Sequence, residues 1–217
     1  MVNGSIAIES IAILVERRLS SAMTKLNETT SLLAFLKSRK SASAKAMTGP
    51  GPSADQIAEI LEIAVRVPDH GKLAPWRFIL FEGEARAKVG DSFAQVWAAQ
   101  NPSHGPEIFN FQRGLFMRAP VVLAVVSTAA PHGKIPVWEQ QMSAAAVCYN
   151  AVMAATALGF DAQWQSDWVI YDEGAKTVMG VNAAEKIAGL IYIGHSSVQL
   201  EDRPRPDALA LLTRWEK

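Results

Sequence analysis

The residues best suited to chemistry are cations that lie in three separate parts of the chain. Arg39-Lys40-Ser41 follows one predicted helix, Arg66 and His70 border a central loop, and Arg203 and Arg205 lie near the C-terminus. Arginine and a serine hydroxyl donate charge-assisted hydrogen bonds to phosphate, and prolines beside the last two arginines reduce the entropy lost on fixing them. The set indicates a phosphate site built from distant segments. The alternative is that Arg39-Lys40-Ser41 is only a basic helix C-terminus, which the helix dipole favours.

Other catalytic patterns do not appear in the sequence. Gly194-His195-Ser196-Ser197-Val198 fails as a nucleophile elbow because Val198 stands where a second glycine must permit the sharp turn. The chain has neither a dinucleotide-binding glycine fingerprint nor a Walker A sequence, and its four histidines lack metal-ligand spacing. The single cysteine, Cys148, lies in an apolar helix and is predicted to be a buried, inert thiol. We therefore predict no metal site.

Composition limits the classes of protein that remain. The chain has 217 residues, of which 49% are hydrophobic, and its 21 basic and 21 acidic residues give a formal net charge of zero. That balance argues against a nucleic-acid or anionic-membrane binder. One cysteine excludes an internal disulfide framework, so a reducing, cytoplasmic location is expected.

The N-terminus is predicted to lie outside the main domain. Residues 5–15 are apolar, but Glu9 interrupts them and no basic residue precedes them, which argues against a secretory signal. They are also too few to span a bilayer. We interpret residues 1–30 as a short amphipathic or frayed extension and residues 31–217 as the functional domain. Whether residues 1–22 precede a natural start at Met23 stays open.

Mixed helices and strands must position these side chains. Ser53 and Gln56 form a predicted capping box at the start of a helix that ends before Pro68. Further helices are expected over 31–38, 84–118, 139–158 and 172–180, and strands over 77–81, 121–127, 162–166 and 187–193. The helix at 139–158 has apolar residues on nearly every face, so it is either central or packed against a partner chain. Without strict alternation, this order favours an α+β layered domain.

Several short motifs share an order and spacing with one known family. Ser38-Arg39-Lys40-Ser41 precedes Arg66-Val67-Pro68-Asp69-His70 and then Pro75-Trp76-Arg77-Phe78. Val137–Ala144, Trp164-Gln165-Ser166 and the Arg-Pro-Arg-Pro tail follow. Together they resemble the nitroreductase family, and more closely its compact, YdjA-like branch of FMN-dependent, NAD(P)H-using enzymes, over about residues 31–215. The chain departs from that pattern at Lys40, where the branch usually has arginine, and at Leu73-Ala74, where the wider family has a polar residue.

The resemblance implies a fold and a set of cofactor-binding residues. The fold would be an α+β three-layer sandwich, with a mixed or mostly antiparallel sheet flanked by helices, in an intertwined homodimer with FMN at the subunit interface. One subunit would hold FMN through Arg39, Lys40 and Ser41, and the other through Arg66 and His70. The remaining implied flavin contacts are Trp164, Gln165, Ser166, Arg203 and Arg205, and the implied NAD(P)-binding segment is Ala154, Ala155, Thr156, Ala157, Leu158 and Gly159.

The resemblance also implies a reaction. Hydride would pass from NAD(P)H through FMN to a nitroaromatic, a quinone or a related electron-poor acceptor by a ping-pong mechanism. FMN would carry the chemistry, so no catalytic side chain is predicted. The expected partners are a second copy of the chain, NAD(P)H and a small acceptor, with neither nucleic acid nor membrane. Two alternatives stay open, namely a non-catalytic FMN carrier or sensor and a flavin-fragmenting or dehalogenating relative.

Overall fold

The computed structural model describes residues 25–215, so most of the predicted N-terminal extension, residues 1–24, lies outside the described part. The chain divides into two compact units. Among the described residues, one comprises residues 25–40 with 199–215, and the other comprises residues 41–198. No described helix is both long and apolar enough to cross a membrane.

Within residues 41–198, five strands form one sheet in which every pairing is antiparallel. They are β1 (Met47–Thr48), β2 (Trp76–Glu82), β3 (Val121–Ser127), β4 (Asp161–Gln165) and β5 (Lys186–Ser196). Strand β3 lies between β2 and β5, and β5 also pairs with β4 and β1. The structure confirms the four predicted strands and adds β1, which the sequence pattern does not predict.

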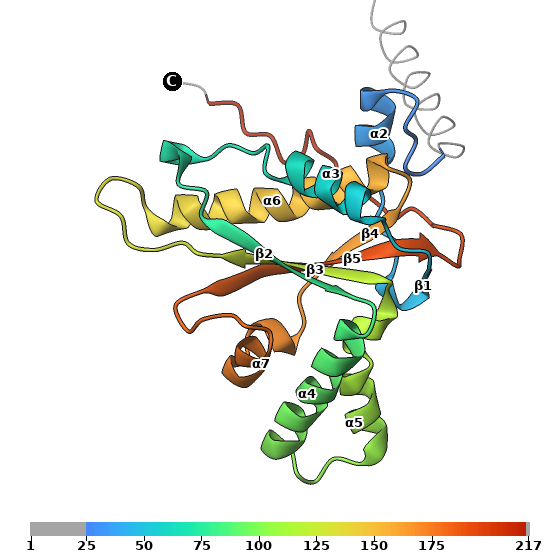
Figure 1. Ribbon diagram of the computed structural model, residues 1–217. Helices are drawn as coiled ribbons and strands as arrows, with labels where there is room; N and C mark the ends of the chain where they lie inside the picture. Colours follow the sequence, from blue (N-terminus) through green and yellow to red (C-terminus); the bar gives the residue numbers. More distant parts are fainter. Residues whose placement is uncertain (1–24, 216–217) are drawn as a thin grey trace, which may run out of the picture. The chain divides into compact units, whose positions relative to one another are not determined.

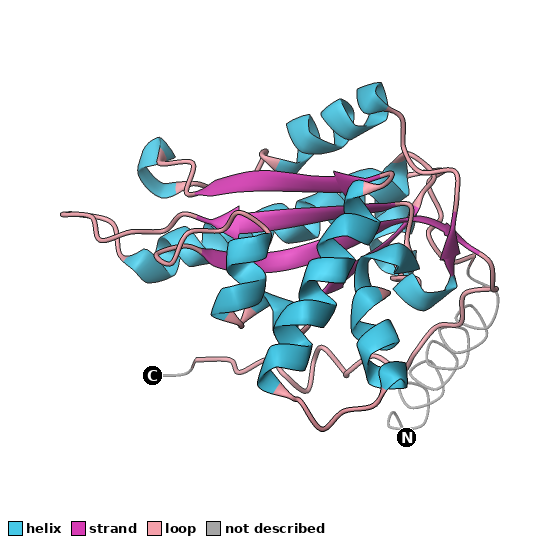
Figure 2. Cartoon of the chain, turned by 60° about the horizontal axis from the view of Figure 1, so that its bottom comes forward, coloured by secondary structure: helices cyan, strands magenta, loops and turns pink. Residues whose placement is uncertain are grey.

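Helices cover both faces of this sheet (Figures 1 and 2), which confirms the predicted three-layer α+β fold. Helices α3 (Ala54–Ala64) and α6 (Val137–Ala157) lie on one side. On the other side lie α4 (Ala85–Gln100), α5 (Pro106–Arg113) and α7 (Glu173–Val178). Four single-turn 3-10 helices connect these elements: η1 (Ala44–Ala46), η2 (His70–Lys72), η3 (Leu115–Arg118) and η4 (Trp168–Ile170).

Strand β3 is the centre of the core, because all of its residues are buried. Val121, Leu123 and Val125 belong to the cluster that also contains residues of α3 and α6. On the opposite face, Phe116 makes edge contacts with Phe93 at 5.0 Å and with Tyr192 at 6.1 Å between ring centroids. Burial on both faces explains why the strand reads as a continuous apolar run rather than an alternating one.

Helix α6 packs on the sheet through most of its surface but leaves one apolar stripe exposed. Trp138, Met142 and Tyr149 are 66%, 46% and 46% exposed. Their i, i+4 and i+11 spacing places them on one face of the helix. The expected all-round burial of this helix is therefore incomplete within a single chain.

The other unit contains α2 (Leu32–Ser38) and the C-terminal tail. Ser31 begins α2 by accepting a hydrogen bond from the Ala34 backbone N–H at 3.1 Å. Beyond the helix, Asn27 Oδ1 accepts the Lys40 backbone N–H at 2.8 Å. Residues 202–206 have no regular secondary structure, as the prolines predict.

Candidate functional site

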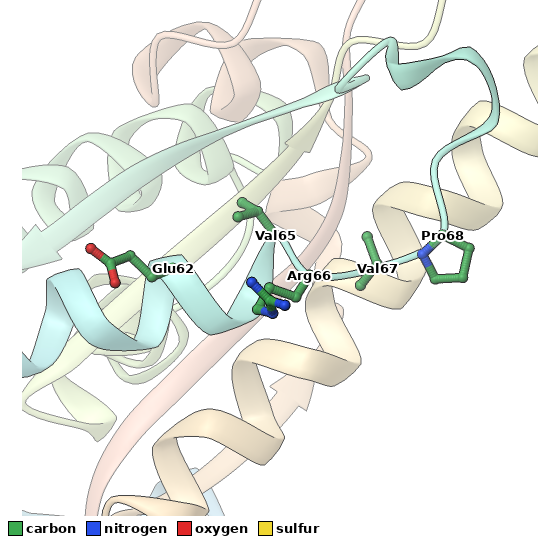
Figure 3. Close-up of a pocket in the computed structure, with 5 residues that line it drawn as sticks. All are labelled: Glu62, Val65, Arg66, Val67 and Pro68. Atoms are coloured by element: carbon green, nitrogen blue, oxygen red, sulfur yellow. The ribbon is translucent and has the colours of Figure 1, made fainter.

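The predicted flavin residue Arg66 lies where α3 ends. The helix starts at the predicted capping box, in which the Gln56 backbone N–H donates to Ser53 Oγ at 3.3 Å and the Ser53 N–H to Gln56 Oε1 at 2.9 Å. Pro68 prevents the helix from continuing. An open pocket of about 720 Å³ borders this end, and its lining residues are Glu62, Val65, Arg66, Val67 and Pro68 (Figure 3).

The loop after Pro68 has an unusual backbone. Gly71, Lys72 and Ala74 have φ angles of 74°, 57° and 46°, in the left-handed region. Each non-glycine residue there costs on the order of 1–2 kcal/mol, so the loop needs external support. Asp69 supplies some of it, since its Oδ2 accepts the Ala74 backbone N–H at 2.8 Å. Strained backbone of this kind clusters at functional sites.

Helix α6 supplies further support through a polar stripe that we call the loop anchor: Glu139, Ser143 and Asn150. Ser143 Oγ donates to the Pro68 carbonyl at 2.7 Å, and Asn150 Nδ2 donates to the carbonyls of Ile63 at 2.7 Å and of Arg66 at 3.3 Å. Glu139 Oε2 lies 2.6 Å from His70 Nδ1. Glu139, Ser143 and Asn150 are spaced i, i+4 and i+11, so they lie on one face of α6. Through them, α6 holds the backbone on both sides of Arg66 and the ring of His70.

The loop anchor borders a second pocket, of about 370 Å³. Its lining residues are Pro68, His70, Trp138, Glu139, Met142, Ser143 and Ala146. The side chains of Trp138 and Met142 make the lining mainly apolar, while His70 and Glu139 form its polar part. Such a mixture suits a flat organic molecule with a few polar atoms.

Trp164, another predicted flavin contact, lies on β4. Its indole is 40% exposed and rests against Gly189 of β5, where any side chain would occupy the same space. Trp164 is therefore not a core tryptophan. The neighbouring Gln165 donates through Nε2 to Gln163 Oε1 at 3.1 Å, and Ser166 is exposed after the strand ends.

In the other unit, Asp202 contacts the Arg205 side chain and the Arg203 backbone, and Lys40 lies near it. Its Oδ1 accepts the Arg203 backbone N–H at 2.8 Å and Arg205 Nη2 at 2.7 Å. The Arg203 N–H, Arg205 and nearby Lys40 lower the pKa of the Asp202 carboxyl. Lys40, which follows α2, and Arg205 of the tail therefore both act on one carboxylate, while their role in binding phosphate stays a prediction. Arg39 belongs to the same unit, and Ser41 begins the other.

The predicted NAD(P)-binding segment and Cys148 are mostly buried within the chain. Ala154, Ala155 and Thr156 of the nicotinamide segment are buried, whereas Ala157 and Gly159 are exposed. Burial also raises the pKa of the Cys148 thiol to about 12, which confirms an inert cysteine.

The candidate nucleophile elbow does not form a strand-to-helix turn: its first three residues lie in β5 and a bend at Ser197 and Val198 follows. His195 and Ser196 continue β5, and the Ser196 backbone N–H donates to Asp161 Oδ2 at 2.7 Å. At Gly194, a Cβ would come within 2.6 Å of Pro120 Cδ, so this glycine permits close packing.

Sequence reasoning missed the loop anchor and Asp202. The predicted helix 139–158 has apolar residues on nearly every face, yet its polar residues Glu139, Ser143 and Asn150 already have the spacing of one face. For Asp202, the available signal was a carboxylate next to two arginines in the sequence.

Comparison with known proteins shows which proteins this chain is similar to. Residues 36–195 match the sequence model of the Nitroreductase family. The protein named "Putative NAD(P)H nitroreductase" from Haemophilus influenzae is 36% identical over 75% of this chain and 86% of its own length. "Putative NAD(P)H nitroreductase YdjA" from Escherichia coli strain K12 is 33% identical over the same shares. A nitroreductase-like protein from Bacillus cereus has the same fold, with a TM-score of 0.73 at 22% identity over 89% of this chain and 100% of its own. The chain therefore belongs to the nitroreductase family of oxidoreductases.

Proposed function

We propose that this chain is an FMN-dependent oxidoreductase that passes hydride from NAD(P)H to nitroaromatic, quinone or related electron-poor acceptors by a ping-pong mechanism. The observation that carries the proposal is that the Arg205 guanidinium and nearby Lys40 both act on the Asp202 carboxylate, which places two cations suited to a phosphate close together. The two relatives from Haemophilus influenzae and Escherichia coli are named as NAD(P)H nitroreductases, which supports NAD(P)H as the electron donor. A nitroreductase structure from Bacteroides fragilis with bound FMN, 19% identical with a TM-score of 0.63 over 87% of this chain and 100% of its own, shares the fold.

The donor chemistry of these residues fits FMN. Arg205 uses one nitrogen on Asp202 and keeps further N–H donors for a phosphate. The Arg66 guanidinium forms no hydrogen bond or ion pair among residues 25–215, and it borders the larger pocket. In this proposal the phosphate contacts are Arg39, Lys40, Ser41, Arg203 and Arg205, and the contacts around the flavin ring are Arg66, His70, Trp164, Gln165 and Ser166.

When bound, FMN supplies the two-electron chemistry. The protein binds and orients it and leaves room for a second flat molecule. The lining of Trp138 and Met142 offers apolar contact to such a molecule, and the loop anchor keeps Arg66 and His70 in place. Successive use of one pocket by NAD(P)H and the acceptor would give ping-pong kinetics. The nicotinamide role of residues 154–159 stays a prediction.

The site is proposed to be completed in a homodimer. The apolar stripe of Trp138, Met142 and Tyr149 is a surface that a second copy would cover. This arrangement would let the cations of one chain and Arg66 of its partner act on the same FMN. Sedimentation equilibrium tests it: a dimer at micromolar concentration is expected, and a monomer at every concentration would contradict it.

The proposed reaction is tested by supplying the purified protein with FMN, removing unbound flavin and adding NADPH or NADH without oxygen. Bleaching of the bound flavin band, followed by its return with a nitroaromatic, is expected. A band that persists after the addition of either nucleotide would favour the carrier or sensor alternative. Product analysis after aerobic incubation would reveal flavin fragmentation.

A further inference from the structure

We infer that His70 and Glu139 form a proton-donating dyad for the acceptor, an inference that rests on the proposed function. His70 Nδ1 and Glu139 Oε2 are 2.6 Å apart, a short distance typical of a charge-assisted hydrogen bond. Among the described residues, no protein group lies within hydrogen-bonding distance of His70 Nε2. A carboxylate that holds one imidazole nitrogen and leaves the other for a reactant is the arrangement that orients histidine acids and bases.

The location of the dyad suits transfer to a small molecule. Both side chains line the pocket of about 370 Å³ that Trp138 and Met142 also line. The side chain of His70 is 63% exposed and that of Glu139 45%, so a small acceptor and solvent can reach them. The loop anchor holds the backbone close by, because Ser143 Oγ bonds to the Pro68 carbonyl at 2.7 Å. The histidine is therefore positioned before any ligand binds.

A quinone acceptor shows how atoms and electrons balance. Reduction of a quinone to a hydroquinone takes two electrons and two protons, and a hydride supplies both electrons and one of the protons. As the hydride arrives, protonated His70 donates the second proton from Nε2 to the quinone oxygen, so the N–H bond breaks while the O–H bond forms. Neutral hydroquinone leaves. The imidazole becomes neutral and keeps Nδ1–H on Glu139, which favours this tautomer. Solvent returns a proton to Nε2.

The first test measures geometry rather than turnover. Long-range ¹H–¹⁵N NMR spectra of the FMN-loaded full chain report the tautomer of each neutral histidine, and the chain has only four. His70 is identified by the signals lost in His70→Gln. The expected tautomer of wild-type His70 is Nδ1–H, with a shift toward Nε2–H in Glu139→Ala. An Nε2–H tautomer in the wild-type protein would overturn the dyad.

The second test separates proton donation from electron transfer. Dithionite-reduced holoenzyme is mixed in a stopped-flow instrument with a p-quinone or with ferricyanide, a one-electron acceptor that takes no proton. General acids contribute about 10²–10⁴-fold, so His70→Gln should lower the quinone-to-ferricyanide rate ratio at least tenfold. Glu139→Gln should lower it less.

His104→Gln is the matched control, because it makes the same substitution at an exposed histidine that lines neither pocket of the site. It should leave the rate ratio unchanged. An unchanged ratio in His70→Gln, or an equal fall in His104→Gln, would refute proton donation. Failure of the wild-type chain to bind FMN would instead refute the proposed function, and the two failures are thus distinguishable.

Discussion

Gly71 gives the most quantitative test of how the loop is built. It has a φ of 74°, and an added Cβ would clash with the terminal Cδ1 atom of Ile135. Gly71→Ala should therefore carry two costs. The left-handed backbone costs about 1 kcal/mol for alanine, and crowding of Ile135, which is only 5% exposed, adds roughly 1–2 kcal/mol. The expected total is about 2–3 kcal/mol of unfolding free energy.

The two costs can be separated because Ile135→Val removes the crowded atom. Alone, that change should cost about 1 kcal/mol. In its presence, Gly71→Ala should cost only the backbone part of about 1 kcal/mol, which leaves a coupling energy of roughly 1–2 kcal/mol. Urea denaturation of the four proteins at one fixed protein concentration, followed by circular dichroism, measures the cycle. Strictly additive costs would refute the proposed contact, and a Gly71→Ala cost below about 0.5 kcal/mol would refute the strained backbone as well.

Other predictions concern the supports of the site. Asn150→Ala removes two bonds to the loop, so we expect a loss of about 1–2 kcal/mol in urea denaturation and weaker FMN binding. Asn150→Asp, which cannot donate, should behave similarly. Arg77 lowers the pKa of Glu185 from 4.5 to about 2, so the pair stabilises the fold above pH 4.5 and loses this effect as the pH falls toward 2. Because the Arg77 side chain is 36% exposed, the pair contributes roughly 1 kcal/mol to the free energy of unfolding. Thermal denaturation between pH 4.5 and pH 2 should show this loss of stability in the wild-type protein but not in Arg77→Met. Gly189→Ala should displace Trp164 and weaken FMN binding several-fold, an effect that disappears when Trp164 is already alanine.

Much of the fold could be predicted because its signals are local. The Ser53 and Gln56 capping box, the stop at Pro68 and the apolar run of 121–127 each specify their element through neighbouring residues. Strand β1 could not be predicted in this way, because its two residues, Met47 and Thr48, are too few to show a period and pair only with β5.

The site was less predictable, since its supports join residues far apart in the chain. Asn150 donates a hydrogen bond to the Ile63 carbonyl, and the sequence around either residue gives no signal of this contact. Positive φ at Lys72 and Ala74 goes against the preferences of both residue types, so only their surroundings impose it. By contrast, the cationic character of Lys40 and Arg205 is plain in the sequence, and both lower the pKa of the Asp202 carboxyl. That they share a phosphate stays a prediction.

The central claim is that this chain holds FMN through its cations, and ligand affinity tests it most directly. Apo-protein is titrated into FMN and, separately, into riboflavin, which lacks the phosphate, while flavin fluorescence is recorded. We expect FMN to bind more tightly than riboflavin, and Arg205→Ala to weaken FMN at least tenfold with little effect on riboflavin. Equal affinities for the two flavins, unchanged by Arg205→Ala, would contradict the phosphate site on which the account depends.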